Sequence, residues 1–156
     1  MKRFLMVAVV GLASTFAFVS AQSETVVVEP FLGGGLGVGI PGGGAYLSLQ
    51  GGADNLLGPL ALRGVLNIGF TGGTELGVDV LNYFPETNQL APYLGGGLAL
   101  GLSAQYYEFH AAGGLEYFVN SDIALFAELQ PALVVVPGFN PDVGANLRFG
   151  ANYHFD

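Results

Sequence analysis

The last stretch of the chain, Asp142 to Phe155, alternates strictly between two kinds of side chain. One set of positions is apolar or aromatic throughout: Val143, Ala145, Leu147, Phe149, Ala151, Tyr153 and Phe155. The positions between them hold glycine, polar or charged residues, so the period of two indicates a β-strand with two different faces. At about fourteen residues, the run exceeds the five or six of an ordinary globular strand. It is long enough for a tilted membrane-spanning strand, which needs roughly nine to eleven residues with the apolar side chains outward.

The first 21 residues have the three parts of a secretory signal peptide. Lys2 and Arg3 form a basic start, an apolar stretch follows, and small residues end the segment at Ala21. A single membrane anchor is the alternative, but Gly11 dilutes the apolar run and no stop-transfer charges follow it. We therefore expect a signal peptide over residues 1–21 and one domain over residues 22–156.

The composition of residues 22–156 excludes several classes of protein. Arg63 and Arg148 are the only basic residues left against twelve acidic ones, a net charge of -10, so nucleic acid is not an expected partner. The absence of cysteine excludes disulfides and thiolate sites. Charged residues make up 10% of the whole chain, whereas a typical soluble domain has about 25%. Because no later segment has eighteen continuous apolar residues, alternating strands in a closed barrel best explain this low charge.

The same alternation recurs along the chain and predicts eight antiparallel strands in an all-β, up-and-down transmembrane barrel. The expected strands are residues 31–40, 45–50, 59–70, 75–84, 92–102, 110–119, 123–133 and 142–155. Glycine-rich and polar segments separate them, including expected loops at Gly51 to Gly58 and at Ser103 to Phe109. An even number of strands lets the last strand close on the first, which leaves no free edge.

Two arrangements of the faces are open to such a barrel. A soluble lipocalin-like barrel, which would carry a lipid inside, is apolar inside and polar outside. Here the polar face is made largely of glycine and alanine with fewer than about ten charges, which is a poor surface for water. The reverse arrangement fits better, because an eight-stranded barrel has an interior that side chains just fill. We expect the apolar face to contact lipid.

The inward-facing charges have complementary positions. If the last hairpin is centred near Gly138, Glu128 lies directly opposite Arg148 on the neighbouring strand. Glu116 on the next strand, and Asp79 with Arg63 across the barrel, are expected at a similar depth. Buried charges are tolerated when they are paired and hydrogen-bonded. The sequence therefore predicts an interior ion-pair network of Arg63, Asp79, Glu116, Glu128 and Arg148.

The chain resembles the eight-stranded outer-membrane β-barrel family, represented by the transmembrane domain of outer-membrane protein A. The resemblance rests on the signal peptide, the eight alternating strands, the inward charges and the final run N-L-R-F-G-A-N-Y-H-F. It implies an outer-membrane location and contact with outer-membrane lipid. It also implies that Leu147, Phe149, Tyr153 and Phe155 form a C-terminal signal for the barrel-assembly machinery. Asp156 displaces the terminal phenylalanine of that signal by one residue.

The resemblance leaves the function open between a structural or interaction role, with other envelope proteins as candidate partners, and a lipid-modifying enzyme on the same scaffold. An enzyme needs a nucleophile, a base and a carboxylate within reach, and Ser103, Glu108 and His110 are the one candidate trio. His110 and His154 are expected near opposite rims, roughly 30 Å apart at about 3.3 Å per residue, so they cannot share a metal ion. We expect no enzyme, cofactor or metal site. We also expect no open pore, because eight strands enclose no channel. The expected outer loops are short, which does not favour a large adhesive surface.

Overall fold

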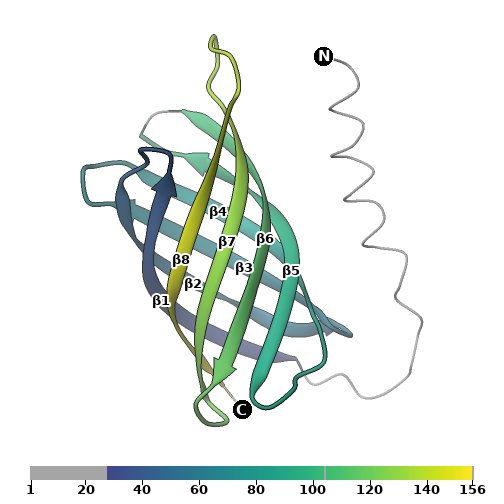
Figure 1. Ribbon diagram of the computed structural model, residues 1–156. Coiled ribbons are helices and arrows are strands. Elements are labelled where there is room, and N and C mark those ends of the chain that lie inside the picture. The colour runs from purple at the N-terminus through teal and green to yellow at the C-terminus, as the bar shows by residue number, and fades with distance from the viewer. Residues whose placement is uncertain (1–27, 104, 156) are drawn as a thin grey trace.

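A computed structural model describes residues 28–103 and 105–155 of the chain. The expected signal peptide and residues 22–27 lie outside the described residues. Eight antiparallel strands form a closed barrel in sequence order (Figure 1). The strands are β1 (Glu29–Ile40), β2 (Ala45–Leu57), β3 (Leu60–Gly69), β4 (Thr74–Tyr83), β5 (Leu90–Gly101), β6 (Tyr106–Phe118), β7 (Ile123–Val135) and β8 (Asp142–His154). The predicted eight-stranded up-and-down barrel is confirmed.

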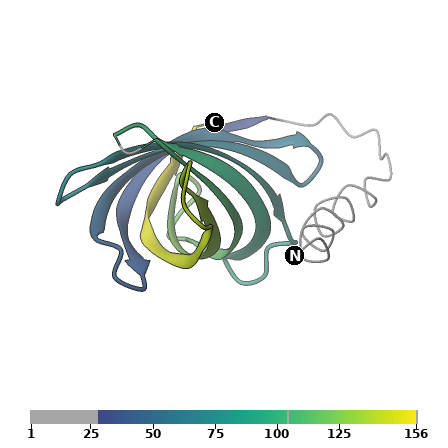
Figure 2. The ribbon, with the colours of Figure 1, turned by 90° about the horizontal axis from the view of Figure 1, so that it is seen from above.

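Closure is achieved by the strand with the clearest alternation in the sequence. β8 pairs with β7 on one side, where Glu128 lies opposite Arg148, and with β1 on the other, where Gly35 lies opposite Gly150. Viewed from above, the strands curve around a common interior (Figure 2). Every strand therefore has a hydrogen-bonded neighbour on both sides, which removes the free edges of an open sheet.

Two expected loops are wrong, because both segments belong to strands. Residues 51–57 continue β2, with Gly52 opposite Arg63, and a register shift between Ala53 and Leu57 accommodates Asn55 at φ 56°. The glycines and Asp-Asn pair that suggested a loop thus form an irregular strand end. The segment from Tyr106 belongs to β6, so His110 lies within that strand and does not begin it.

The two faces of the barrel differ as expected for a transmembrane strand pattern. Large apolar side chains such as Leu36, Leu98, Leu129 and Phe149 are exposed on the outside, at 42 to 49% of their surface. Charged and amide side chains within the strands, such as Arg63, Glu128 and Asn152, face inward and are buried. The described residues contain no helix with the length and apolar character to cross a membrane. The soluble lipocalin-like arrangement requires the opposite distribution.

Glycines on the inner face make room for aromatic rings from neighbouring strands. A Cβ atom added to Gly37 would clash with the ring of Tyr46 on β2, and one added to Gly101 would clash with the ring of Tyr106 on β6. The inner face of β1 is formed by glycine at four consecutive inward positions: Gly33, Gly35, Gly37 and Gly39. The interior is therefore filled by long side chains from the other strands lying against bare backbone.

Replacing Gly150 by alanine is expected to lower the free energy of unfolding by about 1 to 3 kcal/mol, because it overpacks the β1–β8 seam. The new Cβ would clash with the carbonyl oxygen of Gly34 and lie 2.6 Å from the Cα of Gly35. Urea unfolding in detergent micelles measures the loss. The matched control is Gly113→Ala on the outer face, where the nearest atom is 3.6 Å away. Equal stability of the two variants would contradict the steric argument.

Candidate functional site: the interior polar network

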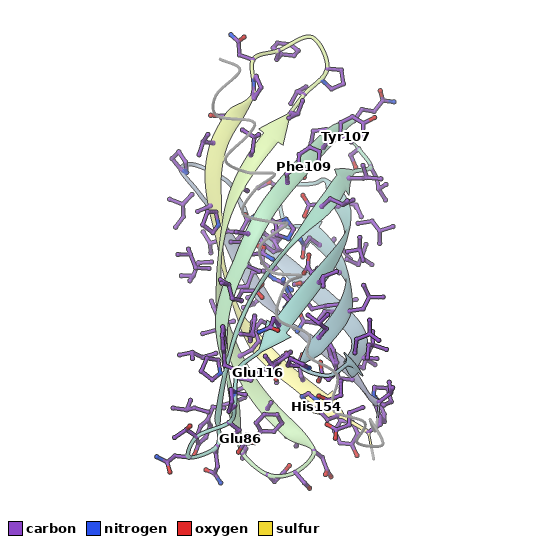
Figure 3. All side chains as sticks on the ribbon, turned by 90° about the vertical axis from the view of Figure 1, so that its right-hand side faces the viewer. Glu86, Tyr107, Phe109, Glu116 and His154 are labelled. Atoms are coloured by element: carbon purple, nitrogen blue, oxygen red, sulfur yellow. The ribbon has the colours of Figure 1, made fainter. Side chains whose placement is uncertain are left out.

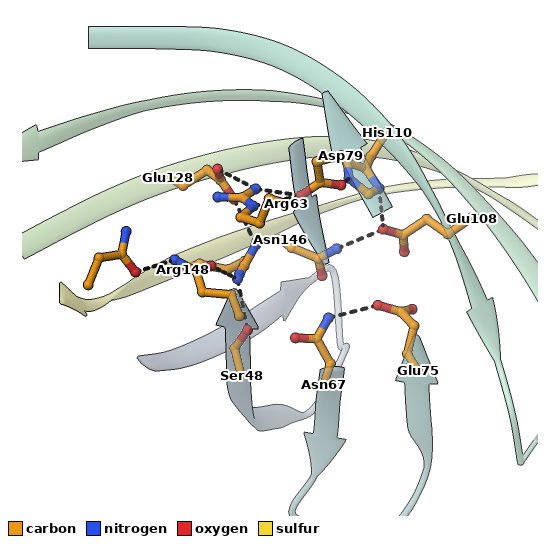
Figure 4. Close-up of polar contacts among 12 residues, drawn as sticks. Ser48, Arg63, Asn67, Glu75, Asp79, Glu108, His110, Glu128, Asn146 and Arg148 are labelled. Atoms are coloured by element: carbon orange, nitrogen blue, oxygen red, sulfur yellow. Dashed lines mark hydrogen bonds and ion pairs between the residues drawn. The ribbon is translucent and has the colours of Figure 1, made fainter. Parts of the chain in front are cut away.

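Two arginines and two carboxylates form the centre of the barrel interior. Arg63 Nη2 lies 2.6 Å from Asp79 Oδ2 and 2.8 Å from Glu128 Oε2. Arg148 Nη1 donates to Glu128 Oε1 at 2.9 Å (Figure 4). All four side chains are at most 3% exposed. Glu128 is the shared partner, since it contacts both guanidinium groups.

Strand pairing accounts for two of these contacts, and barrel curvature for the third. Arg63 and Asp79 are opposite each other on β3 and β4, and Glu128 and Arg148 are opposite each other on β7 and β8. Neighbouring residues with the same inward direction are close enough to pair directly. The contact between Arg63 and Glu128 joins β3 to β7, which are not neighbours in the sheet. The centre therefore ties opposite walls of the barrel together.

Amide and hydroxyl side chains extend the network toward the end of the barrel where His154 lies. Arg148 Nη2 donates to Ser48 Oγ at 2.8 Å and to Gln50 Oε1 at 2.6 Å. Gln50 donates to Asn152 at 2.7 Å, and Asn152 donates to Glu116 Oε1 at 2.6 Å. These bonds satisfy buried polar groups that would otherwise cost free energy.

A histidine ends the network in each direction. His110 lies between Asp79, with Nε2 at 2.8 Å from Oδ1, and Glu108, with Nδ1 at 3.2 Å from Oε1. His154 lies between Asp54, at 3.3 Å from its Nδ1, and Glu116, at 3.7 Å from its Nε2. His154 and Glu116 lie toward the end of the barrel opposite Tyr107 (Figure 3). The two histidines thus serve different carboxylate pairs.

The end of the barrel remote from the C-terminus is a polar, partly open mouth. Glu75 accepts hydrogen bonds from Asn67 at 2.8 Å and from Tyr106 at 2.7 Å. Glu108 accepts one from Asn146 at 3.2 Å. Two adjoining hollows of about 200 and 220 Å³ share Tyr106, Glu108 and Asn146 in their walls. The buried arginine centre lies deeper than this mouth, so its side chains occupy the path through the barrel.

The predicted network residues are all inward and buried, but they do not all contact one another. Arg63, Asp79, Glu128 and Arg148 form the centre, as described above. Glu116 contacts neither arginine directly, because it lies closer to the C-terminal end and is reached through Asn152. The network also includes His110 and His154, which were expected near the rims, and Ser48, Gln50 and Asn152, which sequence reasoning did not single out although their inward parity could have found them. Asp54 and Glu108 were missed as network residues because both lie in segments expected to be loops.

The residues of the expected assembly signal lie on the outside of β8. Leu147, Phe149, Tyr153 and Phe155 are 44 to 49% exposed. The rings of Tyr153 and Phe155 meet edge to face with centroids 4.9 Å apart. These four side chains therefore form one accessible stripe that runs from the middle of β8, where Leu147 lies opposite Leu129, to the end of the described chain.

The residues of the candidate enzyme trio do not share one surface. Ser103 is exposed in the turn after β5, whereas Glu108 faces the interior at 6% exposure. Both ring nitrogens of His110 face carboxylates, those of Asp79 and Glu108, and neither is directed to Ser103. Among the described residues, no group of three histidine, aspartate or glutamate side chains has the arrangement to hold a metal ion.

Solved structures with a similar fold are membrane barrels. A chain from a study titled "De novo design of transmembrane beta-barrels" superimposes with a TM-score of 0.60 at 16% identity, covering 86% of this chain and all of that one. Neisserial surface protein A gives 0.58 at 16% identity, with 82% and 96% covered. This chain has the fold of a transmembrane β-barrel.

The N-terminal β-barrel domain of Pseudomonas aeruginosa OprF gives a TM-score of 0.57 at 14% identity, covering 82% of this chain and 97% of that domain. No family model matches the chain, and no curated protein matches it. The likeness at this level of identity concerns the fold.

Proposed function

We propose that this protein is a small outer-membrane β-barrel with a structural or interaction role in a bacterial envelope and no open pore. The observation that carries the proposal is the distribution of side chains: the outer surface is apolar around the barrel, and the interior holds the charges. Such a molecule is stable where its outside contacts hydrocarbon and its backbone bonds are all satisfied within the closed sheet.

The outer membrane is the proposed location because of the kind of barrel this chain resembles. Two of the similar structures are a neisserial surface protein and a domain of OprF. The expected signal peptide provides a route out of the cytoplasm. Outer-membrane lipid is the proposed partner of the apolar surface, and the barrel-assembly machinery the proposed partner of the stripe around Phe149 and Tyr153.

The interior supports a role without transport or catalysis. The side chains of Arg63, Glu128 and Arg148 are at most 3% exposed and hold one another across the barrel, which supports a packed plug. Opening a path would separate buried charges from their partners, at a high cost in free energy. The engagement of both nitrogens of His110 by carboxylates supports a role in packing for that residue.

Envelope fractionation followed by gel electrophoresis tests the proposal. The protein is expected in the outer-membrane fraction that requires detergent for extraction. Its mobility on a denaturing gel is expected to change only after boiling, because a closed barrel with every edge paired resists the detergent at room temperature. A periplasmic protein that needs no detergent and shows the same mobility before and after boiling would overturn the proposal.

A further inference from the structure

The hairpin between β7 and β8 differs from the other turns at its end of the barrel. It rises beyond them at the top of the molecule, with Val136 to Pro141 forming its tip (Figure 1). Phe139 in this tip is 76% exposed, and Val143 at its base is 71% exposed. These are the two largest exposed fractions among the large apolar side chains of the described residues. Two apolar side chains of this hairpin, Phe139 and Val143, are therefore largely uncovered by the rest of the barrel.

The outer side of this hairpin continues the apolar belt of the barrel without a break. Val143 lies opposite Leu133, which in turn lies opposite Phe109 on β6. Tyr107, beside Val135, is 50% exposed and extends the same surface. Pairing of β8 with β1 ends where Ala145 meets Ile40. The apolar surface therefore reaches further on the β6–β8 side than on the β1 side.

Charge does not interrupt this surface. Between Pro131 and Leu147 the sequence contains one charged residue, Asp142, which lies opposite Val134 and lines a hollow of the mouth. A hairpin that stands in water is ordinarily polar, with apolar side chains kept off its surface. The other turns at this end are shorter, and two of them also carry an exposed apolar side chain, Phe70 at 65% and Leu102 at 58%. The β7–β8 hairpin differs from them in rising beyond the rim and in carrying the most exposed apolar side chain, Phe139.

We propose that the tip of the β7–β8 hairpin lies against the membrane, with Phe139 among the lipid chains near the headgroups, and does not stand free in water. The inference rests on the proposed function, because it requires the barrel to be in a bilayer. The occupant is lipid because the surface is continuous with the lipid-facing belt and carries no charge for a polar partner. An aromatic side chain at the headgroup level is a common anchor in membrane barrels. The hairpin then anchors the β6–β8 side of the barrel.

The chain contains no tryptophan, so a single introduced tryptophan reports on its own surroundings. The test uses Phe139→Trp in the full barrel, reconstituted in phosphatidylcholine vesicles with or without brominated acyl chains, which quench fluorescence on contact. Leu125→Trp on the outer face of β7 is the lipid control, and Glu86→Trp in the β4–β5 turn is the water control. Heat-dependent gel mobility verifies that each variant is folded.

The expected result is an emission maximum for Phe139→Trp that is blue-shifted from that of Glu86→Trp. The fraction of Phe139→Trp fluorescence that brominated lipid quenches is expected to be more than half the fraction that it quenches for Leu125→Trp. Emission and acrylamide quenching equal to those of Glu86→Trp, with Leu125→Trp still quenched by brominated lipid, would overturn the inference alone. A blue-shifted emission that brominated lipid does not quench would also overturn it, because the tip would then pack on protein such as a second copy. Failure of brominated lipid to quench Leu125→Trp would overturn both the inference and the proposed function.

Discussion

Replacing Glu128 by leucine is expected to lower the free energy of unfolding by about 3 to 5 kcal/mol, the cost of removing one partner from a buried ion pair. Glu128 receives Arg148 at 2.9 Å and Arg63 at 2.8 Å. Without it, Arg148 keeps only the neutral oxygens of Ser48 and Gln50 as described partners. Its positive charge would then be buried without a counter-charge. Arg63 is affected less, because Asp79 remains 2.6 Å away.

Equilibrium unfolding in urea, in detergent micelles and in lipid vesicles, measures this loss. Glu86→Leu, in the exposed turn after β4, removes the same charge without burying an unpaired one and should be close to neutral. The double variant Glu128→Leu with Arg148→Met should recover part of the loss, since it removes both charges of the β7–β8 pair. A double variant less stable than Glu128→Leu alone would contradict this account of the network.

Replacing Leu129 by arginine is expected to cost about 2 to 4 kcal/mol in lipid vesicles, the cost of a cation at the bilayer midplane. Leu129 is the central residue of β7, faces outward and is 48% exposed. The exposed surface of this residue is the decisive point: on a soluble protein, a charge at a half-exposed position would be nearly neutral. The substitution therefore separates the membrane barrel from the soluble one directly.

Depth provides the matched control for this experiment. Ile123 begins β7 at the end near the C-terminus and faces the same side as Leu129. Ile123→Arg is expected to cost only about 0 to 1 kcal/mol, because a charge near the interface reaches water. Unfolding free energies of both variants in vesicles of defined thickness give the comparison. Equal costs at the two positions would indicate that no hydrocarbon surrounds the strand.

The sequence was sufficient for the fold because the period of two leaves little choice of face. In β8 each inward residue is polar or glycine and each outward one is apolar, so a one-residue error in the strand would be visible. The two loop predictions were wrong where residues typical of turns hid the alternation of apolar and polar side chains. Gly51 and Gly52 pair with β3 although they read as a loop, and the strand irregularity lies further on, toward Asn55.

The site was predictable only as far as hairpin geometry determines it. Glu128 and Arg148 could be matched because they lie at equal distances from the β7–β8 turn. The contact between Arg63 and Glu128 joins strands that are four apart in order, so it depends on how the strands tilt and how the barrel curves. The placement of Glu116 with His154, away from the arginines, depends on the same tilt. Sequence spacing does not determine directly where residues of distant strands lie along the barrel axis.

The glycine-lined inner face of β1 bears on the order in which the molecule can be put together. The network is supplied by side chains from β2, β3, β4, β6, β7 and β8, and β1 gives it none of the side-chain bonds described above. None of the charges in the network therefore depends on a β1 side chain for its partner. Between Gly33 and Gly39 the inward positions of β1 are all glycine, and Phe31, whose ring lies against His154, is its one large inward side chain. β1 is thus the strand whose late pairing with β2 and β8 would disturb the interior contacts least.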